Sequence, residues 1–208
     1  MRHKQNPLSA IAVIFWVFLC AGCASLFGWN IHAPGVLSDN YFTVVAPVKG
    51  RVALQLPDHL EKYESRNKGG SLADPQTYYI GEAFQPMILE AFQHSFDEFL
   101  LMQVEPTPEM MARYDVPYLV RVRIKDFRND VGLKGQKVEL VTETVVFDAQ
   151  LQQVERFESS GSSDAQKVFA KKGGPEVNLN AAIENNLRAM VQHLQDTLYA
   201  PDLRGNSQ

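Results

Sequence analysis

A regular apolar stripe near the end of the sequence constrains the fold more than any other feature. Its residues recur at intervals of three or four, the period of one face of an α-helix: Ile183, Leu187, Met190, Val191, Leu194 and Leu198. The pattern predicts an amphipathic helix over about 179–198, with Asn178 or Asn180 as N-cap and Pro201 beyond its end. An apolar helix face must be covered, so the chain must fold into at least two layers.

A second amphipathic helix is predicted over about 81–101. Its apolar residues repeat mainly every four positions: Phe84, Met87, Ile88, Ala91, Phe92, Phe96 and Phe99. Pro86 should lie in about the first turn, where a missing N–H matters least. We interpret this stripe as a face that packs on a sheet. The alternative is a pocket for an apolar ligand, lined by four aromatic residues of the stripe: Phe84, Phe92, Phe96 and Phe99.

Alternating patterns predict the sheet. Six ranges show a strand pattern of varying strength: 42–46, 51–56, 100–104, 118–125, 138–147 and 151–159. The last three are joined by short connections, which favours an antiparallel meander. The predicted fold class is therefore α/β (α+β): a two-layer sandwich in which two amphipathic helices cover one face of a mixed sheet.

The domain boundaries follow from the same patterns. Residues 43–200 suit a single domain in size. Residues 23–42 contain turn-forming residues and few apolar runs, so we expect a flexible tether there. Residues 58–77 are polar and are predicted to form a loop, and 201–208 a polar tail.

The first 22 residues have the three zones of an export signal. A basic start, Arg2–Lys4, precedes an almost wholly apolar run, Leu8–Leu19, and then the small residues Ala21 and Gly22 before Cys23. The apolar run is shorter than the roughly 20 residues that a transmembrane helix needs. Residues 1–22 are therefore interpreted as a signal peptide, with an uncleaved signal anchor or cleavage at another position as alternatives.

The cleavage region resembles the lipobox of bacterial lipoproteins. Ala21, Gly22 and Cys23 match its last three positions, whereas Cys20 stands where the family prefers an aliphatic residue. The resemblance implies a diacylglycerol and an N-acyl chain on Cys23, and several acyl chains anchor a protein stably. Ala24, in place of the aspartate that retains such proteins in the inner membrane, implies the periplasmic side of the outer membrane.

Cysteine content and charge exclude two classes of protein. The only cysteines, Cys20 and Cys23, lie in the export region, so the domain can form no internal disulfide and must rely on its core. The formal net charge of −4 provides no basic footprint for nucleic acid, and no nucleic-acid partner is expected.

The sequence contains no motif that indicates catalysis. It has no nucleophile elbow, phosphate loop or dinucleotide fingerprint. The histidines downstream of Cys23 stand alone, without metal-ligand spacing: His32, His59, His94 and His193. We expect no enzyme activity, no metal and no cofactor apart from the acyl chains on Cys23.

One sheet face has the character of a partner surface. Arg121, Arg123 and Lys125 share one face of the strand predicted over 118–125. They could pair across strands with Glu139 and Glu143, or they could dock another protein. Both interpretations remain open at this point.

The order of elements resembles an α/β domain of several envelope lipoproteins. These are the TolB amino-terminal domain, the curli secretion lipoprotein, the Pel-type export lipoprotein and the activators of peptidoglycan synthases, with the lipopolysaccharide-transport lipoprotein as a related case. The matching stretches cover most of the domain: Val52–Pro57, Gly81–Leu101, Tyr118–Lys125, Val138–Asp148 and Ala181–Leu198. This resemblance implies binding and assembly rather than catalysis.

The sequence is therefore consistent with two functions. The first is a non-enzymatic accessory or scaffold subunit of an envelope transport, export or assembly complex, anchored in the outer membrane through Cys23. The second is a carrier of lipid or glycolipid. The sequence predicts an envelope partner but does not identify it, and it leaves the oligomeric state open.

Overall fold

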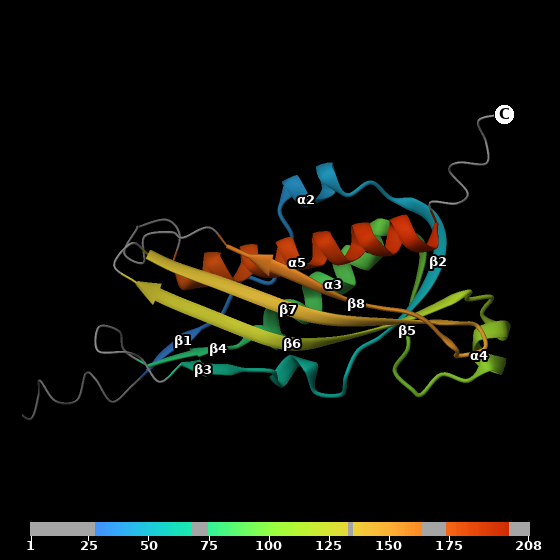
Figure 1. Ribbon diagram of the computed structural model, residues 1–208, viewed down its shortest axis with the longest axis horizontal. Helices are drawn as coiled ribbons and strands as arrows, with labels where there is room; N and C mark the ends of the chain where they lie inside the picture. Colours follow the sequence, from blue (N-terminus) through green and yellow to red (C-terminus); the bar gives the residue numbers. More distant parts are fainter. Residues whose placement is uncertain (1–27, 68–74, 133–134, 164–173, 200–208) are drawn as a thin grey trace, which may run out of the picture.

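A computed structural model describes residues 28–67, 75–132, 135–163 and 174–199 (Figure 1). The predicted signal peptide, Cys23 and the polar tail over 201–208 lie outside the described residues. The elements follow one another as β1 (Trp29–Ile31), α2 (Asp39–Val44), β2 (Val48–Gln55), η1 (Leu60–Lys62), β3 (Ser65–Asn67), β4 (Gln76–Tyr78), α3 (Ile80–Ser95), β5 (Phe96–Leu101), α4 (Pro108–Arg113), β6 (Tyr118–Gly132), β7 (Gly135–Asp148), β8 (Gln153–Ser162) and α5 (Pro175–Leu198).

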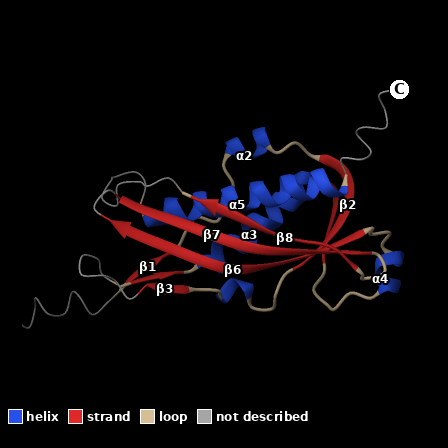
Figure 2. Cartoon of the chain, viewed as in Figure 1, coloured by secondary structure: helices blue, strands red, loops and turns tan. Residues whose placement is uncertain are grey.

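The main layer is a five-stranded mixed sheet with the order β5-β2-β6-β7-β8. β2 pairs in parallel with both β5 and β6, whereas β6, β7 and β8 form an antiparallel meander. The long helices α3 and α5 lie side by side on one face of this sheet (Figures 1 and 2). The predicted two-layer α+β sandwich with two helices on one face is thus confirmed.

Strand alternation assigns the side chains to the two faces. On β7, residues at even positions such as Val138, Leu140 and Val146 are buried beneath the helices, where they meet Phe92 and Leu187 in one apolar cluster. Residues at odd positions lie on the opposite face, which we call the open face. One end of the open face is covered by α4, through a second small core: Ala53, Met102, Met111, Val116 and Leu119.

The first long helix is shorter than predicted. α3 ends at Ser95, and Phe96 and Phe99 belong to β5, where Phe99 lies opposite Val52 of β2. The parallel pairing of β5 with β2 therefore overrides the helical period at residue 96. Pro86 is the seventh residue of α3 rather than part of its first turn, because the helix already begins at Ile80.

Much of the predicted tether belongs to the folded domain. Trp29–Ile31 forms β1, and Asp39–Val44 forms a helix where a strand was predicted over 42–46. Ile31 and Tyr41 are 1% and 0% exposed, so this segment contributes to the main core. It is held there by hydrogen bonds with Asn180 and Glu184 of α5. Turn-forming residues in the local sequence give no sign of these distant partners.

A second, small sheet takes up part of the range predicted as a loop over 58–77, where β3 and most of β4 lie. It has the order β1-β4-β3, with β1 parallel and β3 antiparallel to β4. Side-chain hydrogen bonds fix it to the hairpin of β6 and β7. The Gln136 amide donates to the Tyr78 hydroxyl and to Asn129 Oδ1, and the Asn129 amide donates to Gln76 Oε1. Burial raises the pKa of Tyr78, so its hydroxyl stays protonated.

The C-terminal helix begins four residues earlier than predicted. Pro175 occupies its first turn after Gly174, so neither Asn178 nor Asn180 is the N-cap. Both asparagines instead lie inside the helix, where Asn180 bonds the N-terminal segment. The apolar stripe predicted from the sequence is buried as expected, with Ile183 and Leu187 both 0% exposed.

Candidate functional site

The candidate site is the charged part of the open face, beyond the area that α4 covers. The sheet alternation places Arg121, Arg123 and Lys125 of β6 together on this face, as the sequence predicted. Each of them is paired. Arg123 contacts Glu143, Lys125 contacts Glu158, and Arg121 contacts Glu105.

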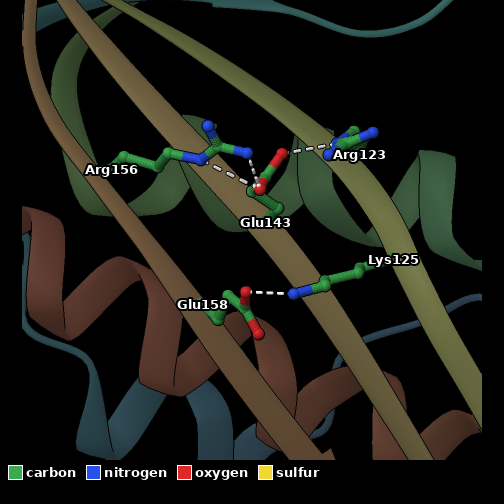
Figure 3. Close-up of polar contacts among 5 residues, drawn as sticks. All are labelled: Arg123, Lys125, Glu143, Arg156 and Glu158. Atoms are coloured by element: carbon green, nitrogen blue, oxygen red, sulfur yellow. Dashed lines mark hydrogen bonds and ion pairs between the residues drawn. The ribbon is translucent and has the colours of Figure 1, made fainter.

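Glu143 is the centre of this arrangement (Figure 3). It lies directly opposite Arg123 in the β6–β7 register, and Arg123 Nε donates to its Oε2 at 2.5 Å. Arg156 of β8 donates from Nε to the other carboxylate oxygen at 3.0 Å, and its terminal nitrogen also contacts that oxygen. The Glu143 side chain is only 6% exposed, whereas those of Arg123 and Arg156 are 60% and 55% exposed.

These contacts stabilise the ionised carboxylate. The hydrogen bond from Arg123, followed by the one from Arg156, lowers the pKa of Glu143 to about 2 from its ordinary value of 4.5. Glu143 in turn raises the pKa of Arg123. Two guanidinium groups share one carboxylate, so these three side chains taken together are net positive at neutral pH. We call Arg123, Glu143 and Arg156 the guanidinium cluster.

A groove of about 510 Å³ adjoins the guanidinium cluster. Arg121 forms part of its wall, held by hydrogen bonds to Gln55 Oε1 at 2.6 Å and to Glu105 at 2.5 Å. Its guanidinium carbon also stacks 4.9 Å from the ring centre of Phe147. Arg121 and Gln55 lower the pKa of Glu105 by hydrogen bonding. The groove is therefore lined by three arginines in fixed positions, with Val145 among its apolar lining. Asp58, Glu105 and Glu143 also line it and balance the charge of the arginines.

Arg156 and Glu105 are site residues that the sequence reasoning missed. Arg156 shares a face of β8 with Glu158, and a meander with a known register would have placed it next to Glu143. The register was not available from the sequence alone. Glu105 lies between β5 and α4, in a connection without a periodic pattern, so no sequence signal identified it.

The aromatic residues proposed for a lipid pocket are core residues instead. Phe84 and Phe92 are 0% exposed and Phe96 is 2% exposed. Phe92 packs against both Phe96 and Phe99, with ring centres 5.4 and 5.9 Å apart. Phe99 is partly buried against the same cluster, and these four residues line neither the groove beside the guanidinium cluster nor a second groove beside α4.

A second groove, of about 450 Å³, lies beside α4. Arg51 crosses it and contacts Glu98, and it donates hydrogen bonds to the backbone oxygens of Tyr114 and Asp115 at 2.9 and 3.2 Å. Asp97 also lines this groove. Arg51 of β2 thus connects β5 with the residues that follow α4, and these contacts stabilise the fold.

The histidines are dispersed over the described part of the chain. His32 contacts Glu82 at 2.7 Å, His193 contacts Glu155 at 2.7 Å, and His94 bonds the backbone oxygen of Val45 at 2.9 Å. Within residues 28–67, 75–132, 135–163 and 174–199, no group of three or more His, Cys, Asp or Glu side chains is arranged to hold a metal ion.

None of the helices in the described ranges combines the length and the apolar character needed to cross a bilayer.

Comparison with known proteins gives similarity at the level of the fold. No protein-family model matches the sequence, and no curated protein does. A Chlamydia trachomatis protein described as hypothetical is 15% identical, with a TM-score of 0.46 over 74% of this chain and 99% of that chain. The PelC dodecamer from Paraburkholderia phytofirmans is 10% identical, with a TM-score of 0.37 over 69% of this chain and 92% of that chain.

A lipoprotein from Neisseria meningitidis (GNA1162) is also similar. It is 7% identical, with a TM-score of 0.31 over 73% of this chain and 100% of that chain. Identities and scores this low describe a shared arrangement of elements and carry no argument about activity or partners.

Proposed function

We propose that this chain is a non-enzymatic lipoprotein, anchored by acyl chains on Cys23 at the periplasmic side of the outer membrane. In this proposal it serves as an accessory or scaffold subunit of an envelope transport, export or assembly complex. The open face of the sheet is the surface that holds the partner.

The guanidinium cluster is the observation that carries this proposal. Glu143 fixes the positions of Arg123 and Arg156, and each exposed guanidinium retains N–H groups that point to solvent or partner. Arginines held in place lose little conformational freedom on binding, and their planar donors match carboxylate groups. A rigid sheet that presents exposed guanidinium donors therefore suits the carboxylates of an acidic segment of another protein.

The lipid anchor contributes through local concentration. A domain tethered by a short segment meets partners in the same membrane at an effective concentration in the millimolar range. A partner that binds weakly to the isolated domain would then be largely bound in the envelope. This is why a modest groove on the open face is sufficient for a scaffold.

Site-specific photo-crosslinking in the native envelope tests the proposal. A photoreactive amino acid replaces Val145 in the groove or, as a matched control, Asp196 on the exposed side of α5. We expect an envelope protein to be captured from position 145 and not from position 196. Arg156→Gln should weaken the capture, since it removes one guanidinium and leaves Arg123 to pair with Glu143.

Three results would contradict this function. Equal capture at both positions would mean that the open face is no partner surface. Capture of lipid alone at position 145 would favour the carrier. Cys23→Ser should abolish both acylation and capture, and a variant that still fractionated with membranes would remove the basis for the anchor.

A further inference from the structure

The start of the domain is fixed to the end of the β6–β7 hairpin. Trp29 lies opposite Gln76 in the β1–β4 register, and Gln76 accepts a hydrogen bond from Asn129 at 3.0 Å. Asn129 is three residues from Gly132, where β6 ends. Figure 1 shows β1, β3, β4 and the arrowhead of β6 together at one end of the molecule, with α4 at the other. The small sheet of β1, β4 and β3 and the end of the β6–β7 hairpin are therefore joined at one end of the domain.

The length of the chain before Trp29 limits how the domain can stand on a membrane. Six residue steps separate Cys23 from Trp29, and a fully extended chain of that length reaches at most about 22 Å. β6 runs from Tyr118, near α4, to Gly132, a distance of about 45 Å at the ordinary strand rise. An inverted domain would hold Trp29 away from the lipid by about 45 Å, the length of β6, which is roughly twice as far as this tether can reach.

The side chains at this end suit a phospholipid surface. Trp29 and Val131 are large apolar residues that remain 50% and 37% exposed. Tryptophan is enriched where membrane and water meet, because its ring is apolar and its N–H is polar. Arg66 and Arg128 line one groove at this end and are 72% and 64% exposed. Each pairs with one neighbouring carboxylate, Glu64 or Asp126, and a guanidinium has five N–H donors, so each keeps donors for phosphate oxygens.

We propose that this end of the domain, defined by Trp29, Arg66, Arg128 and Val131 and called the hairpin end, rests on the phospholipid headgroups of the membrane that holds Cys23. The guanidinium cluster then lies about 30 Å from the lipid, since Arg123 is nine residues before Gly132. The open face is thereby presented to partners away from the membrane. This orientation rests on the proposed acylation of Cys23.

Tryptophan fluorescence tests the orientation in the acylated mature chain. The sequence has two tryptophans, Trp16 and Trp29, and cleavage before Cys23 removes the first. In a Trp29→Phe background, Val131→Trp places the only tryptophan at the hairpin end, and Tyr114→Trp places it at the α4 end as the matched control. Each protein is inserted into vesicles of phosphatidylethanolamine and phosphatidylglycerol, with and without bromine on the acyl chains, because bromine quenches tryptophan only at close range.

We expect bromine to quench the tryptophan of Val131→Trp at least threefold more than that of Tyr114→Trp, and to quench Trp29 of the unaltered chain as strongly. Equal quenching at the two ends would overturn the orientation. Labelling by a lipid-linked maleimide of Asp130→Cys and Ala112→Cys, both at exposed positions, gives the same comparison if a tryptophan variant does not fold. The intact mass reports acylation separately: an unacylated chain removes the proposed anchor, whereas an acylated chain with equal quenching removes the orientation alone.

Discussion

Gly161 of β8 lies against the backbone of Asn186 in α5. A Cβ atom at residue 161 would stand 2.1 Å from the backbone nitrogen of Asn186 and 2.2 Å from the backbone oxygen of Ala182. Both neighbours are backbone atoms of a helix, so they cannot move aside locally. The absence of a side chain at Gly161 therefore sets how closely α5 approaches the edge of the sheet.

Gly161→Ala should destabilise the domain by about 2 kcal/mol, because the helix must shift to accommodate one methyl group. Chemical unfolding of the mature chain measures this change. Ser162→Ala is the matched control, since Ser162 is exposed on the same strand. Equal stability of the two variants would mean that α5 is held less closely than the structure indicates.

Asn186→Ala should destabilise the domain by about 3 kcal/mol, because buried groups lose their partners. The Asn186 amide donates to the backbone oxygens of Leu140 and Ser159 at 3.2 and 2.8 Å, and its Oδ1 accepts from the Thr142 hydroxyl at 3.0 Å. Asn185→Ala removes one exposed bond, to the backbone oxygen of Ser162, and should cost less than 1 kcal/mol. Unfolding curves that coincide for the two variants would contradict the role of Asn186.

The layers of the fold could be predicted because they depend on local periodicity. The stripe containing Ile183 and Leu187 and the alternation over 118–125 are each visible within one segment. Placing the arginines of β6 on one face needed only the two-residue period of a strand. The same local reasoning predicted the sandwich, since an apolar helix face and an apolar sheet face must cover each other.

Features that depend on distant partners could not be predicted in this way. The change from helix to strand at Phe96 follows from pairing with β2, which lies more than forty residues earlier in the sequence. β1, β3 and β4 have three residues each, too few for a periodic signal. The contact of Arg156 with Glu143 required the register of β7 and β8, which is set by the whole meander.

Glu143→Gln should change how stability depends on acidity. The native pKa of Glu143 is about 2, below its ordinary value of 4.5 in an unfolded chain. Its charge therefore stabilises the fold above pH 4.5, and this contribution is lost as the pH falls from 4.5 towards 2. Glu143→Gln should be less stable than the parent at pH 7. Its free energy of unfolding should also fall less steeply than that of the parent between pH 4.5 and pH 2.

Unfolding measured at several pH values checks this dependence. Arg156→Gln should give an intermediate profile, because Arg123 still lowers the pKa of Glu143. If the free energy of unfolding of Glu143→Gln fell as steeply between pH 4.5 and pH 2 as that of the parent, other carboxylates, and not Glu143, would determine the acid sensitivity.

The connection between α5 and the N-terminal segment should open when Asn180 is replaced. Asn180 Oδ1 accepts from the Gly35 amide at 3.0 Å, and its amide donates to the Val36 backbone oxygen at 2.8 Å. Asn180→Ala should therefore speed hydrogen exchange at the Gly35 amide about tenfold, since losing a bond of this kind costs about 1 kcal/mol or slightly more. The Ser38 amide should change less, because Glu184 still accepts its hydrogen bond at 2.8 Å.

Hydrogen exchange read residue by residue separates this local opening from a general loss of stability. If the amides of the β6–β7 hairpin accelerated equally, Asn180 would be supporting the whole fold rather than the segment before α2. A local effect would leave the membrane orientation unchanged. Because β1 still pairs with β4, the tether before Trp29 keeps its length, and a tryptophan at the hairpin end should still be quenched more strongly than one at the α4 end in the Asn180→Ala background.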